Sequence, residues 1–165
     1  MTLVVPEGEI AIDDPRVDEV GQLLERHLAF CNEHSPPEDV HALDVQGLLD
    51  PAVTFFSFRR YGELLGVGAL KRLDPHHAEV KSMHTAEAAR GQGIGRAMVE
   101  YLIAAARDRG FVRVSLETGT MSAFAAARSL YARVGFVPCR PFGEYRESSN
   151  STFMTLIIDD RSSPS

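Results

Sequence analysis

The sequence predicts a mixed α/β fold in which helices flank a central, mostly antiparallel sheet. Two β-branched and aromatic runs, residues 53–60 and 63–73, are joined by a Tyr-Gly pair, which favours a tight antiparallel hairpin. A strand-like segment, a glycine-preceded helix and a second strand-like segment follow over residues 78–116, the pattern of a right-handed βαβ crossover. The 165 residues contain no repeat and fit one domain, 1–165, of common size.

The overall charge is acidic. A formal net charge of −6 and a pI near 5.5 argue against a nucleic-acid binder, because such proteins need a net basic face. The N-terminus lacks the basic-then-apolar order of a signal peptide, and no apolar run approaches the roughly 18 residues of a membrane span. We therefore expect a cytoplasmic protein with neither a nucleic acid nor a membrane as partner.

The cysteines and histidines form no metal-binding pattern. Cys31 and Cys139 are far apart, so the sequence predicts neither a disulfide framework nor a zinc site. His76 and His77 follow an Asp-Pro pair in an expected turn, where adjacent histidines are usually solvated. We expect no bound metal.

The N-terminal third is expected to hold a strand and two helices. An alternating apolar segment within residues 1–12 predicts the strand. Residues 13–15, Asp-Asp-Pro, are typical of a helix cap and first turn. Two prolines break this helix at residues 35–38, and residues 41–49 predict a short second helix. The first helix is amphipathic, with an apolar stripe made of Val17, Val20, Leu23, Leu24, Leu28 and Cys31.

Residues 78–85 predict a strand with polar groups on both faces. This is unusual for a central strand, so it indicates a ligand on one of the faces. With a period of two, one face carries Glu79, Lys81, Met83 and Thr85, and the other carries Val80, Ser82 and His84.

Helices and strands alternate in the rest of the chain. The helix after the glycine-rich segment is expected to run to Arg109 and to end at Gly110, where a glycine suits a C-cap. Residues 112–116 predict a short strand of the buried, parallel type. The other expected elements are a loop at 117–121, a helix at 122–134 ended by Gly135, a strand from Phe136 and Val137, a polar connection at 139–150, a closing strand at 152–158 and a frayed tail at 159–165.

The segment from Arg90 to Arg96, Arg-Gly-Gln-Gly-Ile-Gly-Arg, opens directly into an alanine-rich helix. Its alternating glycines let a ligand approach the backbone, and the first amides of the helix have no intrahelical partner. The pattern predicts a pyrophosphate cradle. A P-loop is excluded because Arg and Ala, rather than Lys and Ser or Thr, follow Gly95. A dinucleotide fingerprint would need glycine at Met98 and a place in the first strand-to-helix turn.

Two motifs in this order carry a family resemblance. The pattern Gln/Arg-x-x-Gly-x-Gly/Ala is met by Arg90, Gly93 and Gly95, and residues 130–136, Leu-Tyr-Ala-Arg-Val-Gly-Phe, meet the pattern Leu-Tyr-x-x-x-Gly-Phe. Together they resemble the GCN5-related N-acetyltransferase (GNAT) family. Residues 116–119, 138–142 and 151–154 look like a bacterial subgroup of small-molecule acetyltransferases. The resemblance implies acetyl-CoA as co-substrate, a sheet splayed at the acetyl-CoA site and, as in many relatives, a homodimer.

The resemblance places the cofactor between the glycine segment and residues 78–85. Its pyrophosphate would lie on the amides of residues 92–96, and its pantetheine arm would run as a pseudo-strand beside residues 83–85. A strand amide near the acetyl carbonyl would stabilise the tetrahedral oxyanion. The predicted cofactor-binding residues are Met83, His84, Thr85, Arg90, Gly91, Gln92, Gly93, Ile94, Gly95 and Arg96.

Tyr131 and Glu79 are the predicted catalytic residues. Tyr131 matches the family's tyrosine, which serves as the acid, but moving a phenol proton to a thiolate is uphill by roughly 2 kcal/mol, so hydrogen bonding or a core role are alternatives. Glu79 falls where several family members carry a base, and a salt bridge to Lys81 is its structural alternative. His84 suits neutral pH better, but it lies on the opposite face unless a bulge intervenes.

Acceptor contacts are predicted in two places. In the family, the loop between the first two helices helps to form the acceptor site, so Glu38, Asp39 and His41 are candidates, although a rigid solvated turn explains this segment equally well. Arg140 could pair with an acceptor carboxylate or be a surface charge. Phe124 stands where many family members have a cofactor-binding asparagine, so Ser122 or the backbone of residues 119–121 is the expected substitute.

The sequence therefore predicts an enzyme that moves the acetyl group of acetyl-CoA directly to a primary amine of a small molecule. N-acetylation of proteins or peptides is one alternative, because an acidic protein would suit a basic tail. A non-catalytic acetyl-CoA sensor is another, favoured if Glu79 and Tyr131 face the core. No motif identifies the acceptor.

Overall fold

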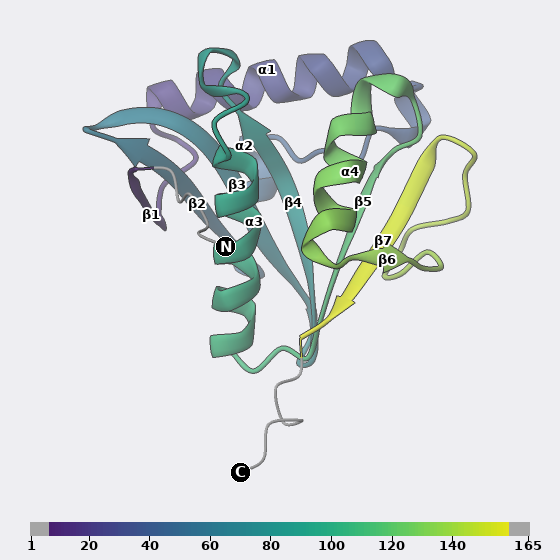
Figure 1. Cartoon of the computed structure of the whole chain (residues 1–165). Helices are drawn as coiled ribbons and strands as arrows, with labels where there is room; N and C mark the ends of the chain where they lie inside the picture. Colours follow the sequence, from purple (N-terminus) through teal and green to yellow (C-terminus); the bar gives the residue numbers. More distant parts are fainter. Residues whose placement is uncertain (1–6, 159–165) are drawn as a thin grey trace.

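The computed structural model describes residues 7–158, and its centre is a seven-stranded sheet in the order β1-β2-β3-β4-β5-β7-β6 (Figure 1). All neighbouring strands are antiparallel except β4 and β5, which are parallel. The predicted mixed, mostly antiparallel sheet is confirmed. The strands are β1 Glu9–Ile12, β2 Val53–Arg60, β3 Glu63–Asp74, β4 His77–Thr85, β5 Arg113–Gly119, β6 Val137–Pro138 and β7 Ser151–Ile157.

Helices cover both faces of this sheet (Figure 1). On one face, α1 (Asp18–His34) and the short α2 (Val45–Leu48) pack against apolar side chains of β2 and β3. On the other face, α3 (Ile94–Asp108) and α4 (Ala125–Val134) enclose the larger part of the core. Single turns of 3₁₀ helix lie at Pro37–Asp39, Glu87–Ala89 and Ser122–Phe124.

The β2–β3 hairpin forms at the predicted Tyr-Gly pair. Tyr61 and Gly62 have φ values of 50° and 82°, and a two-residue type I′ turn needs positive φ at both of its central positions. Arg60 and Glu63 pair directly across the turn. The turn thus sets the register of β2 and β3 as far as the irregularity between Phe58 and Arg59.

The prediction that residues 13–15 begin the first helix is wrong by about one turn, since α1 begins at Asp18. Both aspartates before it are engaged in other contacts. The Asp14 carboxylate accepts the Arg16 amide at 2.9 Å within a turn. The Asp13 carboxylate accepts the Ser57 hydroxyl at 2.6 Å, which fastens this segment to β2 instead.

The predicted loop at 117–121 is also wrong in its first part. β5 continues to Gly119 because β7 pairs with it along its whole length, as far as the pair Gly119 and Ser151. The predicted helix at 41–49 shortens to α2, because the Asp44 side chain caps it by accepting the Gly47 amide at 2.8 Å. The strand extension matters for function, since it places Glu117 within the sheet.

The two parallel strands part after a short stretch of pairing. β4 and β5 pair only from His77 with Arg113 to Glu79 with Ser115. Beyond that point they diverge, and α4 lies in front of the opening (Figure 1). The splay expected of the sheet is therefore present, and it exposes one backbone edge of the second half of β4.

No helix within residues 7–158 is long and apolar enough to cross a membrane. The frayed tail expected at 159–165 lies outside the described residues, as does the start of the apolar segment expected within 1–12.

Candidate active site

A cavity of about 680 Å³ lies where β4 and β5 separate. Its walls come from the C-terminal half of α1, the segment that follows α1, β4, β5, the first turn of α3 and most of α4. Of the residues predicted for the site, Glu38, Gln92 and Arg140 do not line it. Those that do are Asp39, His41, Glu79, Met83, His84, Thr85, Arg90, Gly91, Gly93, Ile94, Gly95, Arg96 and Tyr131.

The glycine segment forms one end of the cavity. Gly91 and Gly93 have φ values of 79° and 80°, and Gly93 is the N-cap of α3. Buried Ile94 anchors the first turn in the core, so the free amides of that turn are presented by a fixed helix end. At Gly95, a Cβ would meet Leu130 Cδ2 at 3.2 Å. Arg90 and Arg96 add positive charge, and this combination fits a pyrophosphate.

A β-bulge in β4 reverses part of the predicted alternation. Val67 pairs with His84 and Ala69 with Lys81, so two residues of β4, Ser82 and Met83, stand opposite a single residue of β3. Ser82 has a φ of 57°. The prediction that Met83 and Thr85 share a face with Glu79 is wrong. His84 instead lies on the α1 face with Glu79 and Lys81, and Met83 turns toward α3.

His84 contacts His27, a histidine of α1, where β4 packs against that helix. Its Nδ1 lies 3.1 Å from Nδ1 of His27, so one ring must donate and the other accept. Burial lowers the pKa of His27 to about 4 and that of His84 to about 3, and each effect is strengthened by neighbouring positive charge. Both rings are therefore neutral at pH 7, and His84 is a weak base.

Glu79 is held by two donors. Its Oε2 accepts the Tyr145 hydroxyl, and the Lys81 ammonium at 3.2 Å. Lys81 also donates to the Tyr145 oxygen at 2.8 Å. Burial, with the negative charge of Glu79, raises the pKa of the Tyr145 phenol, so this hydroxyl remains a donor. The Glu79 side chain, 4% exposed, thus forms the salt bridge considered as its structural alternative.

Glu117 was missed by the sequence analysis, which placed it in a loop. Ser115 is the last residue of β5 that pairs with β4, and Glu117, two residues later, points to the same face of the sheet. Glu117 also lines the cavity. Burial raises the pKa of its carboxyl group to about 7. No cation forms an ion pair with it among the described residues. Alternation from Ser115 is the only sequence signal that could have found it.

Tyr131 closes the core and also lines the cavity. It is 6% exposed, and its ring lies 5.8 Å from that of Phe136. Burial alone raises the pKa of its phenol, so the proton stays on the oxygen at neutral pH.

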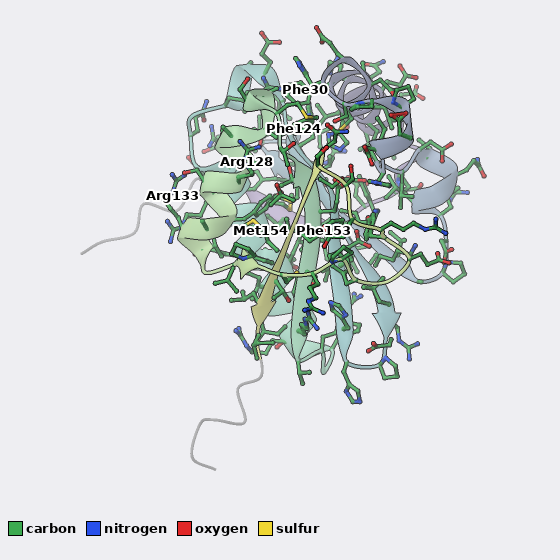
Figure 2. The ribbon with its side chains drawn as sticks, turned by 90° about the vertical axis from the view of Figure 1, so that its right-hand side faces the viewer. Phe30, Phe124, Arg128, Arg133, Phe153 and Met154 are labelled. Atoms are coloured by element: carbon green, nitrogen blue, oxygen red, sulfur yellow. The ribbon has the colours of Figure 1, made fainter. Side chains whose placement is uncertain are left out.

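Phe124 packs against Phe30 of α1, and both residues line the cavity. Its ring lies 5.3 Å from that of Phe30 in an edge-to-face arrangement, and Figure 2 shows the two side chains near each other above α4. Phe124 also covers Gly119, where a Cβ would meet its ring at 2.4 Å. Arg128, lower on α4 in Figure 2, donates to the Gly119 carbonyl at 2.7 Å and fixes this corner.

Two loops are joined beside the cavity. The Asp39 carboxylate accepts the Ser148 hydroxyl at 2.9 Å and the Asn150 amide at 3.0 Å. His41 lies 4.9 Å from Tyr145, ring to ring. The charged end of the cavity, as we call it below, consists of Asp39, His41, Glu79, Lys81 and Glu117.

A glycine-capped helix N-terminus, two splayed parallel strands and a polar cavity between them fit a protein that binds a CoA thioester across an open sheet. The family model of the acetyltransferase (GNAT) family matches residues 18–136. The chain therefore belongs to this family, it is an acetyltransferase, and acetyl-CoA is its co-substrate.

Bacterial proteins are similar in sequence to this chain over most of its length. It is 44% identical over 146 residues to the uncharacterized N-acetyltransferase YsnE of Bacillus subtilis, covering 88% of this chain and 97% of that one. It is 36% identical over 151 residues to the IAA acetyltransferase of Azospirillum brasilense, covering 91% and 97%. A Bacillus subtilis acetyltransferase solved with CoA superposes with a TM-score of 0.69 at 20% identity, covering 92% and 99%.

Proposed function

We propose that this protein transfers the acetyl group of acetyl-CoA directly to a primary amine of a small molecule. The observation that carries the proposal is the two-sided cavity. One end offers helix amides and arginines to phosphates, and the charged end offers three carboxylates and one lysine to the acceptor. An excess of carboxylates favours a cation such as an ammonium group.

Acetyl-CoA would bind along the split. Its pyrophosphate would lie on the first turn of α3, and the amide-bearing pantetheine arm would pair with the edge of β4 that β5 leaves free. A backbone amide of β4 would stabilise the oxyanion, and Tyr131 would donate a hydrogen bond to the departing sulfur. Thioester and acceptor would then meet in one cavity, as direct transfer requires.

A relay through an acetylated enzyme is less favoured. Cys31 is the one cysteine that lines the cavity within residues 7–158. Burial raises the pKa of its thiol to about 11, with a smaller contribution from Glu117, so very little thiolate exists at neutral pH. The nucleophile is thus supplied by the acceptor.

The joined loops support a small acceptor over a polypeptide. Asp39, at the charged end, is hydrogen-bonded to Ser148 and Asn150, and this contact would narrow the path that an extended polypeptide would need. Acetylation of a protein or peptide is the alternative, and the experiment below includes basic peptides to detect it.

The experiment measures free-thiol release from acetyl-CoA by the purified protein, with amino acids, polyamines, aminoglycosides, aryl amines and basic peptides as acceptors. A reaction without acceptor controls for hydrolysis, and thermal melting with and without acetyl-CoA reports cofactor binding. We expect stabilisation by acetyl-CoA and release with one class of small amine. Release with peptides alone would show a peptide acetyltransferase. Stabilisation with no release across the panel would contradict the proposed activity and favour a sensor.

A further inference from the structure

The carboxylates at the charged end differ in how they are bound. Asp39 accepts two hydrogen bonds from the loop at 148–150, and Glu79 accepts the Tyr145 hydroxyl and the Lys81 ammonium. These donors occupy carboxylate oxygens that would otherwise be open to an acceptor amine. Glu117 forms no ion pair within residues 7–158, and the neighbouring Ser151 hydroxyl and the charge of Lys81 only partly offset the effect of burial on its pKa.

The place of Glu117 is also distinctive. The parallel pairing of β4 and β5 ends at Glu79 with Ser115, and Glu117 is the next residue of β5 on the α1 face. It therefore stands at the base of the split, across from Lys81 on β4, on the side of the sheet away from α3. A thioester lying in the split would have Glu117 on the side from which the acceptor enters.

We propose that Glu117 is the general base of the reaction, taking the proton from the ammonium group of the acceptor. This rests on the proposed amine acetylation. Glu79 then acts as a positioning residue, which holds Lys81 and Tyr145 beside the acceptor.

The proton and electron balance is complete with these groups. The Glu117 carboxylate takes one proton from R–NH₃⁺, and the free amine attacks the thioester carbonyl carbon, forming the C–N bond. The tetrahedral adduct collapses, the C–S bond breaks, and the second proton lost from nitrogen reaches the thiolate to give CoA–SH. Glu117 finally releases its proton to solvent.

The electrostatics suit this role. Because burial raises the pKa of Glu117 to about 7, the group is a much stronger base than an exposed glutamate and still partly ionised at neutral pH. The titratable groups that face it are Cys31 from α1, Asp39 and His41 from the segment after α1, Glu79 and Lys81 from β4, and Tyr145 from the loop at 139–150.

The test compares Glu117→Gln with Glu79→Gln, using the amine found in the thiol-release panel. We expect Glu117→Gln to lower kcat about 100-fold at pH 7.5, within the usual range for a general base, with acetyl-CoA stabilisation unchanged. The wild type should lose kcat on acidification through about pH 7 at saturating acceptor. This acid limb of the pH profile of kcat should vanish in Glu117→Gln, remain in Glu79→Gln and shift to a different pH in Glu117→Asp.

The possible failures are distinct. A wild type that releases no thiol with any amine contradicts the proposed function itself. A wild type that is active, with Glu117→Gln within twofold of it and an unchanged acid limb, overturns the role of Glu117 alone. If Glu117→Gln does not fold, as judged by its melting curve, Glu117→Asp decides, and an acid limb identical to the wild type then overturns the role.

Discussion

At Tyr131 a single hydroxyl group separates a structural role from a chemical one. The ring packs on Phe136 and closes the core, and the same residue lines the cavity. Tyr131→Phe keeps the ring and removes only the donor. We expect about tenfold or greater loss of kcat, because a hydrogen bond to the developing thiolate is lost, with little change in melting temperature.

Thiol release and acetyl-CoA stabilisation measure this prediction. Tyr101→Phe is the matched control, since Tyr101 on α3 packs against Phe56 and does not line the cavity. Equal turnover in Tyr131→Phe and Tyr101→Phe would leave Tyr131 as a core residue only.

The histidine pair makes stability depend on pH. The folded-state pKa of His27, about 4, lies below the ordinary 6.5, so the unfolded chain binds more protons and stability falls as pH decreases from about 6.5 toward 4. A shift of this size corresponds to about 3 kcal/mol. His84 acts in the same direction, and Glu117, whose folded-state pKa is raised, acts in the opposite one.

We expect His27→Asn to flatten the loss of unfolding free energy between pH 6.5 and 4. Denaturant unfolding at several pH values measures it, and the comparison with the wild type cancels the contribution of Glu117. His76→Asn, in an exposed turn, is the control and should follow the wild type. Parallel curves for His27→Asn and the wild type would contradict the burial of this pair.

Among the elements, β4 shows where sequence reasoning succeeded and where it stopped. The strand and the start of the helix at the glycine segment were both predicted, because alternation and glycine spacing are local signals. The bulge was not predicted, because a serine in the sequence gives no sign that its φ will be 57°. Glu117 was missed for a related reason, because β5 reaches it only through pairing with β7.

The bulge depends on the absence of a side chain at Gly68. A Cβ there would meet Met83 Sδ at 2.8 Å and Met98 Cγ at 3.1 Å. We therefore expect Gly68→Ala to cost about 1–3 kcal/mol of unfolding free energy, as overpacking of a close-packed core does. Urea unfolding measures the change.

Gly21→Ala is the matched control for this prediction. Gly21 lies inside α1, and a Cβ there would have no closer neighbour than Pro15 O at 4.0 Å. It should stabilise the protein by about 0.5–1 kcal/mol, because alanine favours a helix. Equal effects of the two substitutions would show that the space beside Met83 is not filled.

On the scale of the whole molecule, the cavity is assembled from segments that lie far apart in the described chain. The sheet splits between β4 and β5, the crossover helix α3 brings its N-terminus to the split, and α1 lies on the opposite face of the sheet from α3 (Figure 1). The segment after α1 and the loop before β7 are more than 100 residues apart, and Asp39 joins them. Such a contact cannot be predicted from local pattern, since it exists only once the sheet has formed.

Asp39→Ala would separate these loops while leaving the glycine cradle intact. We expect the KM for the acceptor to rise several-fold, because the charged end loses its fixed wall, while the KM for acetyl-CoA changes little. Steady-state kinetics with each substrate varied in turn measure this split. Ser148→Ala removes one of the two hydrogen bonds and should give a smaller rise, and Asp18→Ala, at the exposed start of α1, should give none. An unchanged acceptor KM in Asp39→Ala would mean that the acceptor binds without help from the joined loops. A rise in both KM values would mean that the contact of Asp39 with Ser148 and Asn150 supports the whole cavity and not the charged end alone.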